Sequence, residues 1–238
     1  MPTEKLTKDN YHILIDELKA SADGKYRDFH ASLVPNEEKG RILGVRMPRL
    51  REIAKEISKT DPRGFLKICG DNYYEERLLR AIVTCLIKPA DFADLCALSD
   101  GMLPYVNSWA VCDTFCSGFK KIKKYRAEFF DHIGEYLDGN EWEQRVALVI
   151  MLCHYLDSEY IDRVLERTDR VHSGAYYVKM AQAWLMATAL AKCPEPALRY
   201  YENNSLDRDV FNKAVQKAVE SRRIDDETKK YLRALQST

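Results

Sequence analysis

Apolar residues recur at helical spacing along almost the whole sequence, and this feature restricts the fold more than any other. After Ser108, for example, Cys112, Phe115, Cys116 and Phe119 stand at positions i, i+3, i+4 and i+7 of one such pattern. Residues at this spacing lie on one face of a helix. No segment shows the alternation of apolar and polar residues that marks a half-buried strand. The pattern therefore predicts an all-α protein.

Proline and glycine residues divide the helical pattern into segments of ordinary helix length. The predicted helices are 10–21, 24–33, 49–58, 62–69, 73–87, 90–97, 108–119, 124–137, 142–156, 159–168, 175–192, 195–203, 208–221 and 226–235.

These segments form about seven helical hairpins with short connections, which favours one continuous stack. Trp109, Trp142 and Trp184 lie 33 and 42 residues apart, within the period range of helical repeats. The segment 146–153 (VALVIMLC) is apolar all round, as the inner helix of a repeat should be, and 159–168 is amphipathic. We therefore expect a single domain over 1–238, a curved α-solenoid of antiparallel helix pairs of the HEAT-like or armadillo-like kind, with a concave side.

The composition excludes several classes of protein. Lys plus Arg and Asp plus Glu both number 37, so the net charge gives no general reason to expect a nucleic-acid partner. The seven cysteines, an odd number, mostly lie in apolar runs, which indicates reduced thiols in a cytoplasmic protein. Lys179 and Gln182 interrupt the longest weakly charged stretch, 174–191, so a membrane span is not expected.

The motifs that bind common cofactors are missing from the sequence. It contains no G-x-G-x-x-G or Walker-type loop, and no C-x-x-C or H-E-x-x-H. Cys112 and Cys116 would be a lone pair of potential ligands on an apolar stripe. We therefore expect neither a metal nor an organic cofactor.

Trp109 and Asp113 are four residues apart, on one flank of the apolar stripe after Ser108. An indole and a carboxylate would therefore share one edge of the helix. The alternative is an exposed aspartate beside a partly buried tryptophan, because charged residues near helix starts are common.

Two cations stand among apolar neighbours. Arg145 shares a helical face with apolar residues, so its guanidinium needs a carboxylate or phosphate partner, either Asp113 or an external anion. Alternatively, it extends over these neighbours with its charged end in water. Lys179 lies near Tyr176, Tyr177 and Trp184, a combination that suits a nucleic-acid backbone or a stacked base nearly as well as a mixed core.

Three basic clusters stand out although the total charge is zero. Each alone is a weak indication of phosphate contact, and together on one concave face they would be a stronger one. The clusters are Lys120, Lys121, Lys123, Lys124 and Arg126; Lys213, Lys217, Arg222 and Arg223; and Arg46, Arg49, Arg51 and Lys55.

Five segments, taken in order, carry a family resemblance. They are LGVRMPRLREIAKEI (43–57), NSWAVCD (107–113), WEQRVAL (142–148), YYVKMAQAWL (176–185) and KAVQKAVESRRI (213–224). Together they resemble the bacterial AlkD-type DNA alkylation repair proteins, which are HEAT-like repeat DNA glycosylases. The similarity runs from about Tyr26 to the C-terminus.

The resemblance implies a monofunctional glycosylase that removes positively charged N3- or N7-alkylated purines from duplex DNA in base excision repair, without a metal or cofactor. It implies that Asp113 is the catalytic carboxylate, that Trp109 and Trp184 are aromatic walls, and that Arg145 contacts DNA. Tyr26 matches a further aromatic residue of the family's cleft. The family can act on a lesion that remains in the duplex.

We expect Lys179, Lys213, Lys217 and Arg222 to contribute to DNA binding, and the protein to act as a monomer in the cytoplasm, at the nucleoid. One departure is Ala187, which stands where some active relatives carry a basic residue. Two alternatives remain: a catalytically silent relative that binds DNA by its shape, and a HEAT-like protein-interaction scaffold.

Overall fold

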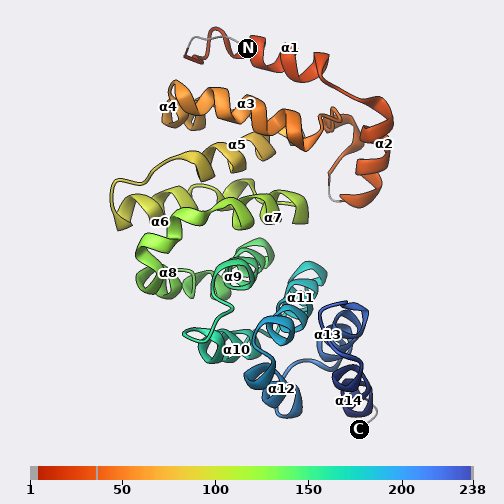
Figure 1. Ribbon diagram of the computed structural model, residues 1–238. Helices are drawn as coiled ribbons and strands as arrows, with labels where there is room; N and C mark the ends of the chain where they lie inside the picture. Colours follow the sequence, from red (N-terminus) through yellow and green to blue (C-terminus); the bar gives the residue numbers. More distant parts are fainter. Residues whose placement is uncertain (1–4, 36, 237–238) are drawn as a thin grey trace. The chain divides into compact units, whose positions relative to one another are not determined.

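The structure is a computed structural model that describes residues 5–35 and 37–236. Over these residues the chain consists of helices and their connections, with no β-strand (Figure 1). This confirms the predicted all-α class. The chain divides into two compact units, residues 1–129 and 130–238, and each is described by itself. A single domain over 1–238 stays a prediction.

The first unit contains seven α-helices, three 3₁₀ segments and the first half of α8 among its described residues. Their bounds are α1 Tyr11–Ala20, α2 Gly24–Leu33, η1 Lys39–Arg41, α3 Met47–Lys59, α4 Pro62–Ile68, α5 Tyr74–Leu86, α6 Phe92–Asp100, η2 Leu103–Tyr105, α7 Trp109–Gly118, η3 Lys120–Tyr125 and α8 Arg126–His132.

The second unit continues from α8. Its elements are η4 Glu135–Asp138, α9 Glu141–His154, α10 Ile161–Asp169, α11 Tyr176–Lys192, α12 Pro194–Glu202, α13 Arg208–Glu220 and α14 Asp226–Gln236.

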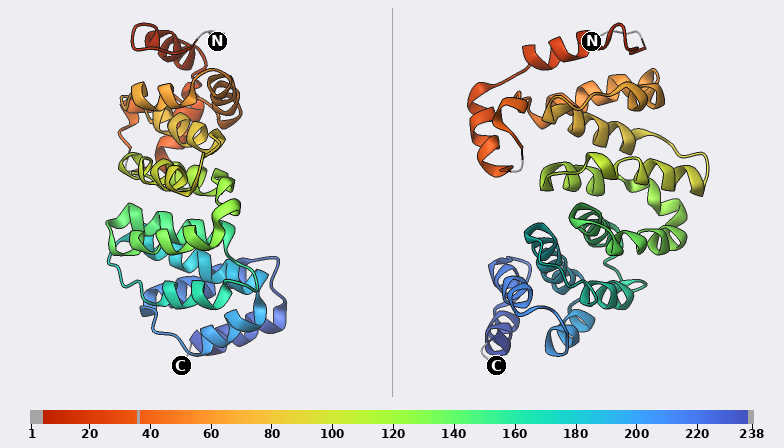
Figure 2. Two further views of the ribbon diagram at one scale, coloured as in Figure 1. Left: turned by 90° about the vertical axis from the view of Figure 1, so that its left-hand side faces the viewer. Right: turned by 180° about the vertical axis from the view of Figure 1, so that it is seen from behind.

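Alternate helices stack on one another within each unit. In the first unit α3 packs on α5, and α5 packs on α7 (Figure 2). In the second unit α9 packs on α11, and α11 packs on α13. The intervening helices α10 and α12 also contact each other. This arrangement confirms the predicted packing of helices in neighbouring pairs, as in a solenoid.

The predicted helix over 124–137 is wrong, because the chain there forms η3, α8 and η4 in succession. In a continuous helix the Gly134 N–H would bond to the Phe130 carbonyl, but here it bonds to the Asp131 carbonyl. The Arg167 guanidinium of α10 donates to the Phe130 carbonyl instead. A Cβ atom at position 134 would lie only 3.1 Å from Arg167 Nη1. An arginine from another helix therefore ends α8.

Glu75 of α5 holds the segment between η1 and α3. Its carboxylate accepts hydrogen bonds from the backbone N–H groups of Leu43, Gly44 and Val45, at 3.0, 2.7 and 3.1 Å. Burial raises the pKa of Glu75, while these bonds oppose that rise. Gly44 has a φ of 91°, and a Cβ atom there would meet the Asp23 carbonyl oxygen at 2.4 Å. Only glycine fits this position.

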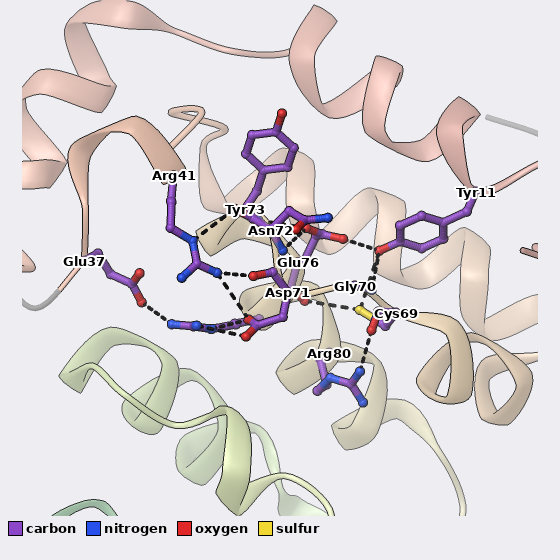
Figure 3. A network of polar contacts seen from close by, with 11 residues as sticks. Tyr11, Glu37, Arg41, Cys69, Gly70, Asp71, Asn72, Tyr73, Glu76 and Arg80 are labelled. Atoms are coloured by element: carbon purple, nitrogen blue, oxygen red, sulfur yellow. Dashed lines mark hydrogen bonds and ion pairs between the residues drawn. The ribbon is translucent and has the colours of Figure 1, made fainter.

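Further polar contacts tie the same region to α5 (Figure 3). Arg77 pairs with Asp71 and, at 2.8 Å, with Glu37 in the connection after α2. Arg41 of η1 donates to the backbone carbonyls of Asp71 and Asn72. Glu37 and Arg77 are both buried. These contacts fix where the chain returns from α2 to the stack, and so help to position α2.

Candidate active site

A cavity of about 1160 Å³ lies in the first unit. Its lining comes from α2, α3, α5, α7 and η3, and is mostly apolar or aromatic. Asp113 and Glu75 supply its carboxylates. A large apolar cavity with a few polar groups is the usual form of a small-molecule or active site.

Helix α7 supplies Trp109 and Asp113 to this cavity. The Ser108 hydroxyl accepts from the Val111 N–H at 3.5 Å and caps the helix. The stripe predicted to face the core does so, because Cys112, Phe115, Cys116 and Phe119 are fully buried. Trp109 and Asp113 lie one turn apart on the flank, are half-buried, and line the cavity together.

Trp109 is held from the other side of the cavity. Its indole Nε1 donates to the backbone carbonyl of Leu33 at 2.7 Å. Leu33 is the last residue of α2, so the bond occupies one of the carbonyls that a helix end leaves without an intrahelical partner. The indole is therefore anchored at its N–H edge.

Helix α2 turns its apolar stripe toward the cavity. Tyr26, Phe29, His30 and Leu33 stand at i, i+3, i+4 and i+7, and all four line it. No residue of α2 is buried, and the Phe29 side chain is 61% exposed. Sequence reasoning identified only Tyr26 of these four. The spacing was the available signal, but spacing does not distinguish a stripe that faces a core from one that faces a cavity.

An aromatic row crosses the cavity wall. The rings of Tyr26 and His30 stack with centroids 5.4 Å apart, and His30 Nε2 lies 3.0 Å from the Tyr74 hydroxyl. The Arg46 guanidinium lies 4.8 Å from the centroid of Tyr26. Burial lowers the pKa of His30 and raises that of Tyr74, so at neutral pH both groups are uncharged.

Cys85 also lines the cavity but does not suit nucleophilic catalysis. Its thiol donates to the Phe115 carbonyl at 3.3 Å, and burial raises its pKa to about 12. A thiol with this pKa stays protonated and unreactive at neutral pH. Asp113 is therefore the better candidate for the reacting group.

The basic clusters predicted for this unit divide between ion pairs and the cavity. Arg46 pairs with Asp23 at 2.8 Å, and Arg49 pairs with Glu17 at 2.6 Å. The cavity is lined instead by other members of the same clusters, namely Arg51, Lys55, Lys120 and Lys121.

The second unit contains the remaining predicted residues. Arg145 is buried on α9, and its Nη1 donates to the Tyr177 carbonyl of α11 at 2.8 Å. Sequence reasoning had anticipated a carboxylate or an external anion as its partner, and this backbone carbonyl is one it missed. The Trp184 side chain on α11 is 36% exposed.

Two predicted DNA-contacting lysines, Lys179 and Lys213, line a second cavity of about 730 Å³ between α11, α13 and α14. Lys179 Nζ pairs with Asp209 Oδ2 at 2.7 Å, and Lys213 Nζ donates to Gln216 at 2.9 Å. Lys217 on α13 is half-buried, and Arg222, just after α13, is exposed.

Within residues 5–35 and 37–236, no cluster of three or more His, Cys, Asp or Glu side chains could hold a metal ion. All seven cysteines are free thiols. Among the helices of the described chain, none combines the length and hydropathy that a bilayer crossing requires.

The structure thus brings Tyr26, Trp109 and Asp113 to one cavity, and Lys179 and Lys213 to another. No curated protein matches the chain. A family model described as "DNA alkylation repair enzyme" matches residues 14–218, which include the whole lining of the first cavity and all but four lining residues of the second. The chain therefore belongs to the DNA alkylation repair enzyme family.

Proposed function

We propose that this protein is a monofunctional DNA glycosylase that excises N3- and N7-alkylated purines from duplex DNA in base excision repair. The observation that carries the proposal is the shared cavity of Asp113, Trp109 and Tyr26, in a chain of the alkylation repair family. It combines the Asp113 carboxylate with the anchored indole of Trp109 and with the ring of Tyr26, which stacks on His30.

The chemistry of the lesion suits this site. An alkylated purine of this kind carries a positive charge and is a good leaving group, so the main task is to stabilise the positive charge that develops on the deoxyribose. A carboxylate about 4 Å from that charge, at an effective dielectric constant of about 20, contributes about 4 kcal/mol. This corresponds to a rate increase of roughly 10³-fold. Asp113 also orients the water that attacks the sugar.

The aromatic rings add a second contribution. Ring faces attract cations by about 0.5–2 kcal/mol each. Trp109 presents an anchored ring in the cavity, and the proposal gives Trp184, whose indole is partly exposed, the same role. A neutral His30 beside Tyr26 adds no positive charge that would oppose a cationic base.

The proposal assigns DNA binding to Arg145, Lys179, Lys213, Lys217, Arg222 and Tyr26. The buried Arg145 would act by fixing the Tyr177 backbone as well as by its charge. Lys179 would need to exchange Asp209 for a phosphate. The proposed reaction uses no cofactor. Duplex DNA is the only macromolecular partner that it needs.

The test is base release from duplex DNA treated with a methylating agent. We expect the protein to liberate 7-methylguanine or 3-methyladenine, and Asp113→Asn to lower the rate by roughly 10³-fold with unchanged helicity. Asp16→Asn is the matched control, because Asp16 is an exposed residue of α1 outside the cavity. DNA binding without base release by the native protein would favour the catalytically silent relative instead. No DNA binding at all would favour the protein-interaction scaffold.

A further inference from the structure

We infer that two basic pairs at the cavity of the first unit form a two-point phosphate clamp. Arg51 and Lys55 of α3 make one pair, and Lys120 and Lys121 of η3 make the other. The inference rests on the proposed function, because it takes DNA as the ligand, and it adds which phosphates these four residues contact.

The four side chains are exposed cations at the same cavity. Arg51 and Lys55 are four residues apart on α3 and so lie on one face of the helix. Lys120 and Lys121 are the first two residues of η3, which is separated from the end of α7 by one residue. Within the described residues none of the four has an ion-pair partner, unlike Arg46 and Arg49 of the same segment. Their charges are therefore available to an external anion.

The rest of the cavity lining is of a different kind. It includes Leu78 and Ile82 from α5 and the aromatic side chains of Trp109 and Tyr26. A ligand that fits such a surface carries anionic groups on both sides of apolar or aromatic parts. Nucleic acid has this composition, with phosphates outside the sugars and bases.

The spacing of the helices assigns each pair to different phosphates. Helix α7 ends at Gly118, five residues and about 7.5 Å along the axis after Asp113, and Lys120 and Lys121 lie just beyond that end. They therefore lie within about three nucleotides of one DNA strand from Asp113. Helix α3 is separated from α7 by α5, and two helix spacings amount to about 16–20 Å. Lys120 and Lys121 therefore contact phosphates within about three nucleotides of the lesion, and Arg51 and Lys55 contact phosphates beyond them.

The first experiment measures the salt dependence of binding to a duplex that contains a non-cleavable abasic analogue. The double variants Arg51→Ala/Lys55→Ala and Lys120→Ala/Lys121→Ala should each reduce the slope of log K against log salt by about 2, since each removes two phosphate contacts. At about 0.1 M salt the affinity should fall at least roughly tenfold.

The matched controls come from the same elements. Lys59 lies one turn after Lys55 on α3, and Lys123 lies two residues after Lys121 in η3. Both are exposed, and neither lines the cavity. Lys59→Ala and Lys123→Ala should each change the slope by much less than 1. Equal slopes for the cavity variants and these controls would overturn the clamp.

The second experiment locates the phosphates. In one duplex, methylphosphonates replace the lesion-strand phosphates within three nucleotides of the abasic analogue. On this duplex Lys120→Ala/Lys121→Ala should no longer change the slope of log K against log salt. Arg51→Ala/Lys55→Ala should still reduce that slope. Loss of both effects, or of neither, would overturn the assignment.

Neither experiment requires base release. A protein that binds DNA through this clamp but releases no base would contradict the proposed glycosylase and leave the clamp intact. A protein that releases alkylated bases with unchanged salt slopes in the cavity variants would contradict the clamp alone.

Discussion

The Trp109 indole and the Leu33 carbonyl form a 2.7 Å hydrogen bond between residues 76 positions apart in the chain. The bond joins the first turn of α7 to the end of α2, which has no buried residue of its own. It connects the two walls that carry Asp113 and Tyr26. The position of α2, and with it the shape of the cavity, depends on contacts of this kind.

Trp109→Phe keeps an aromatic ring but removes the donor to Leu33. We expect the free energy of unfolding in urea to fall by about 1 kcal/mol, the usual net value of one hydrogen bond. Base release should fall as well, because the ring loses its fixed orientation. In Trp142→Phe the ring contact with Tyr177 is retained, so its base release should stay near that of the native protein. Equal base release by the two variants would contradict the anchoring role of Trp109.

Arg77→Ala should be far more destabilising than Arg163→Ala. Removing Arg77 leaves Glu37, whose side chain is 2% exposed, without its ion-pair partner, which typically costs about 3–5 kcal/mol. Arg163 pairs with an exposed Asp131 at 2.8 Å, and such surface pairs contribute less than about 1 kcal/mol. Urea unfolding of both variants gives the comparison. Similar losses would show that the network of Figure 3 does not hold the chain after α2.

His30 should make the protein less stable in mild acid. Burial lowers its pKa in the folded state below its ordinary value of about 6.5. The unfolded chain then binds more protons than the folded one, so stability is complete above about pH 6.5 and falls as the pH decreases toward the folded value. His30→Gln should lose this part of the pH dependence, as urea unfolding at about pH 5.5 and 7.5 would show. An unchanged difference between the two pH values would contradict the assignment to His30.

Asp209→Asn should increase DNA affinity if Lys179 contacts DNA. The substitution removes the carboxylate partner of Lys179 at 2.7 Å and so removes one negative charge from the second cavity, where Lys213 also lies. We expect an affinity increase of roughly threefold to tenfold at low salt, which disappears in the double variant Asp209→Asn/Lys179→Met. Asp162→Asn on the exposed face of α10 changes the net charge equally and serves as the control. The same increase in Asp162→Asn would show a general charge effect.

Several features of the site followed from local sequence patterns. The spacing of Cys112, Phe115, Cys116 and Phe119 predicted a buried face, and this placed Trp109 and Asp113 together on its flank. These relationships involve residues three to seven positions apart in one helix, where backbone geometry alone fixes which side chains are neighbours. The same reasoning predicted most of the helices to within a few residues.

Other features depended on contacts between distant segments. The stripe of α2 has the spacing of a core face, yet it lines a cavity. The helix predicted over 124–137 is interrupted because Arg167 takes the Phe130 carbonyl. Glu75, a charged residue on a helix, is buried because it accepts three backbone N–H groups.

The sequence by itself therefore determined that the chain is all-helical, which faces of its helices are apolar, and that an indole and a carboxylate share one edge of α7. Only the tertiary structure decided which apolar faces are covered and which enclose the cavity with Asp113. The physical reason is range: helical periodicity is set by hydrogen bonds between residues four apart, whereas burial depends on which distant segment packs against each face.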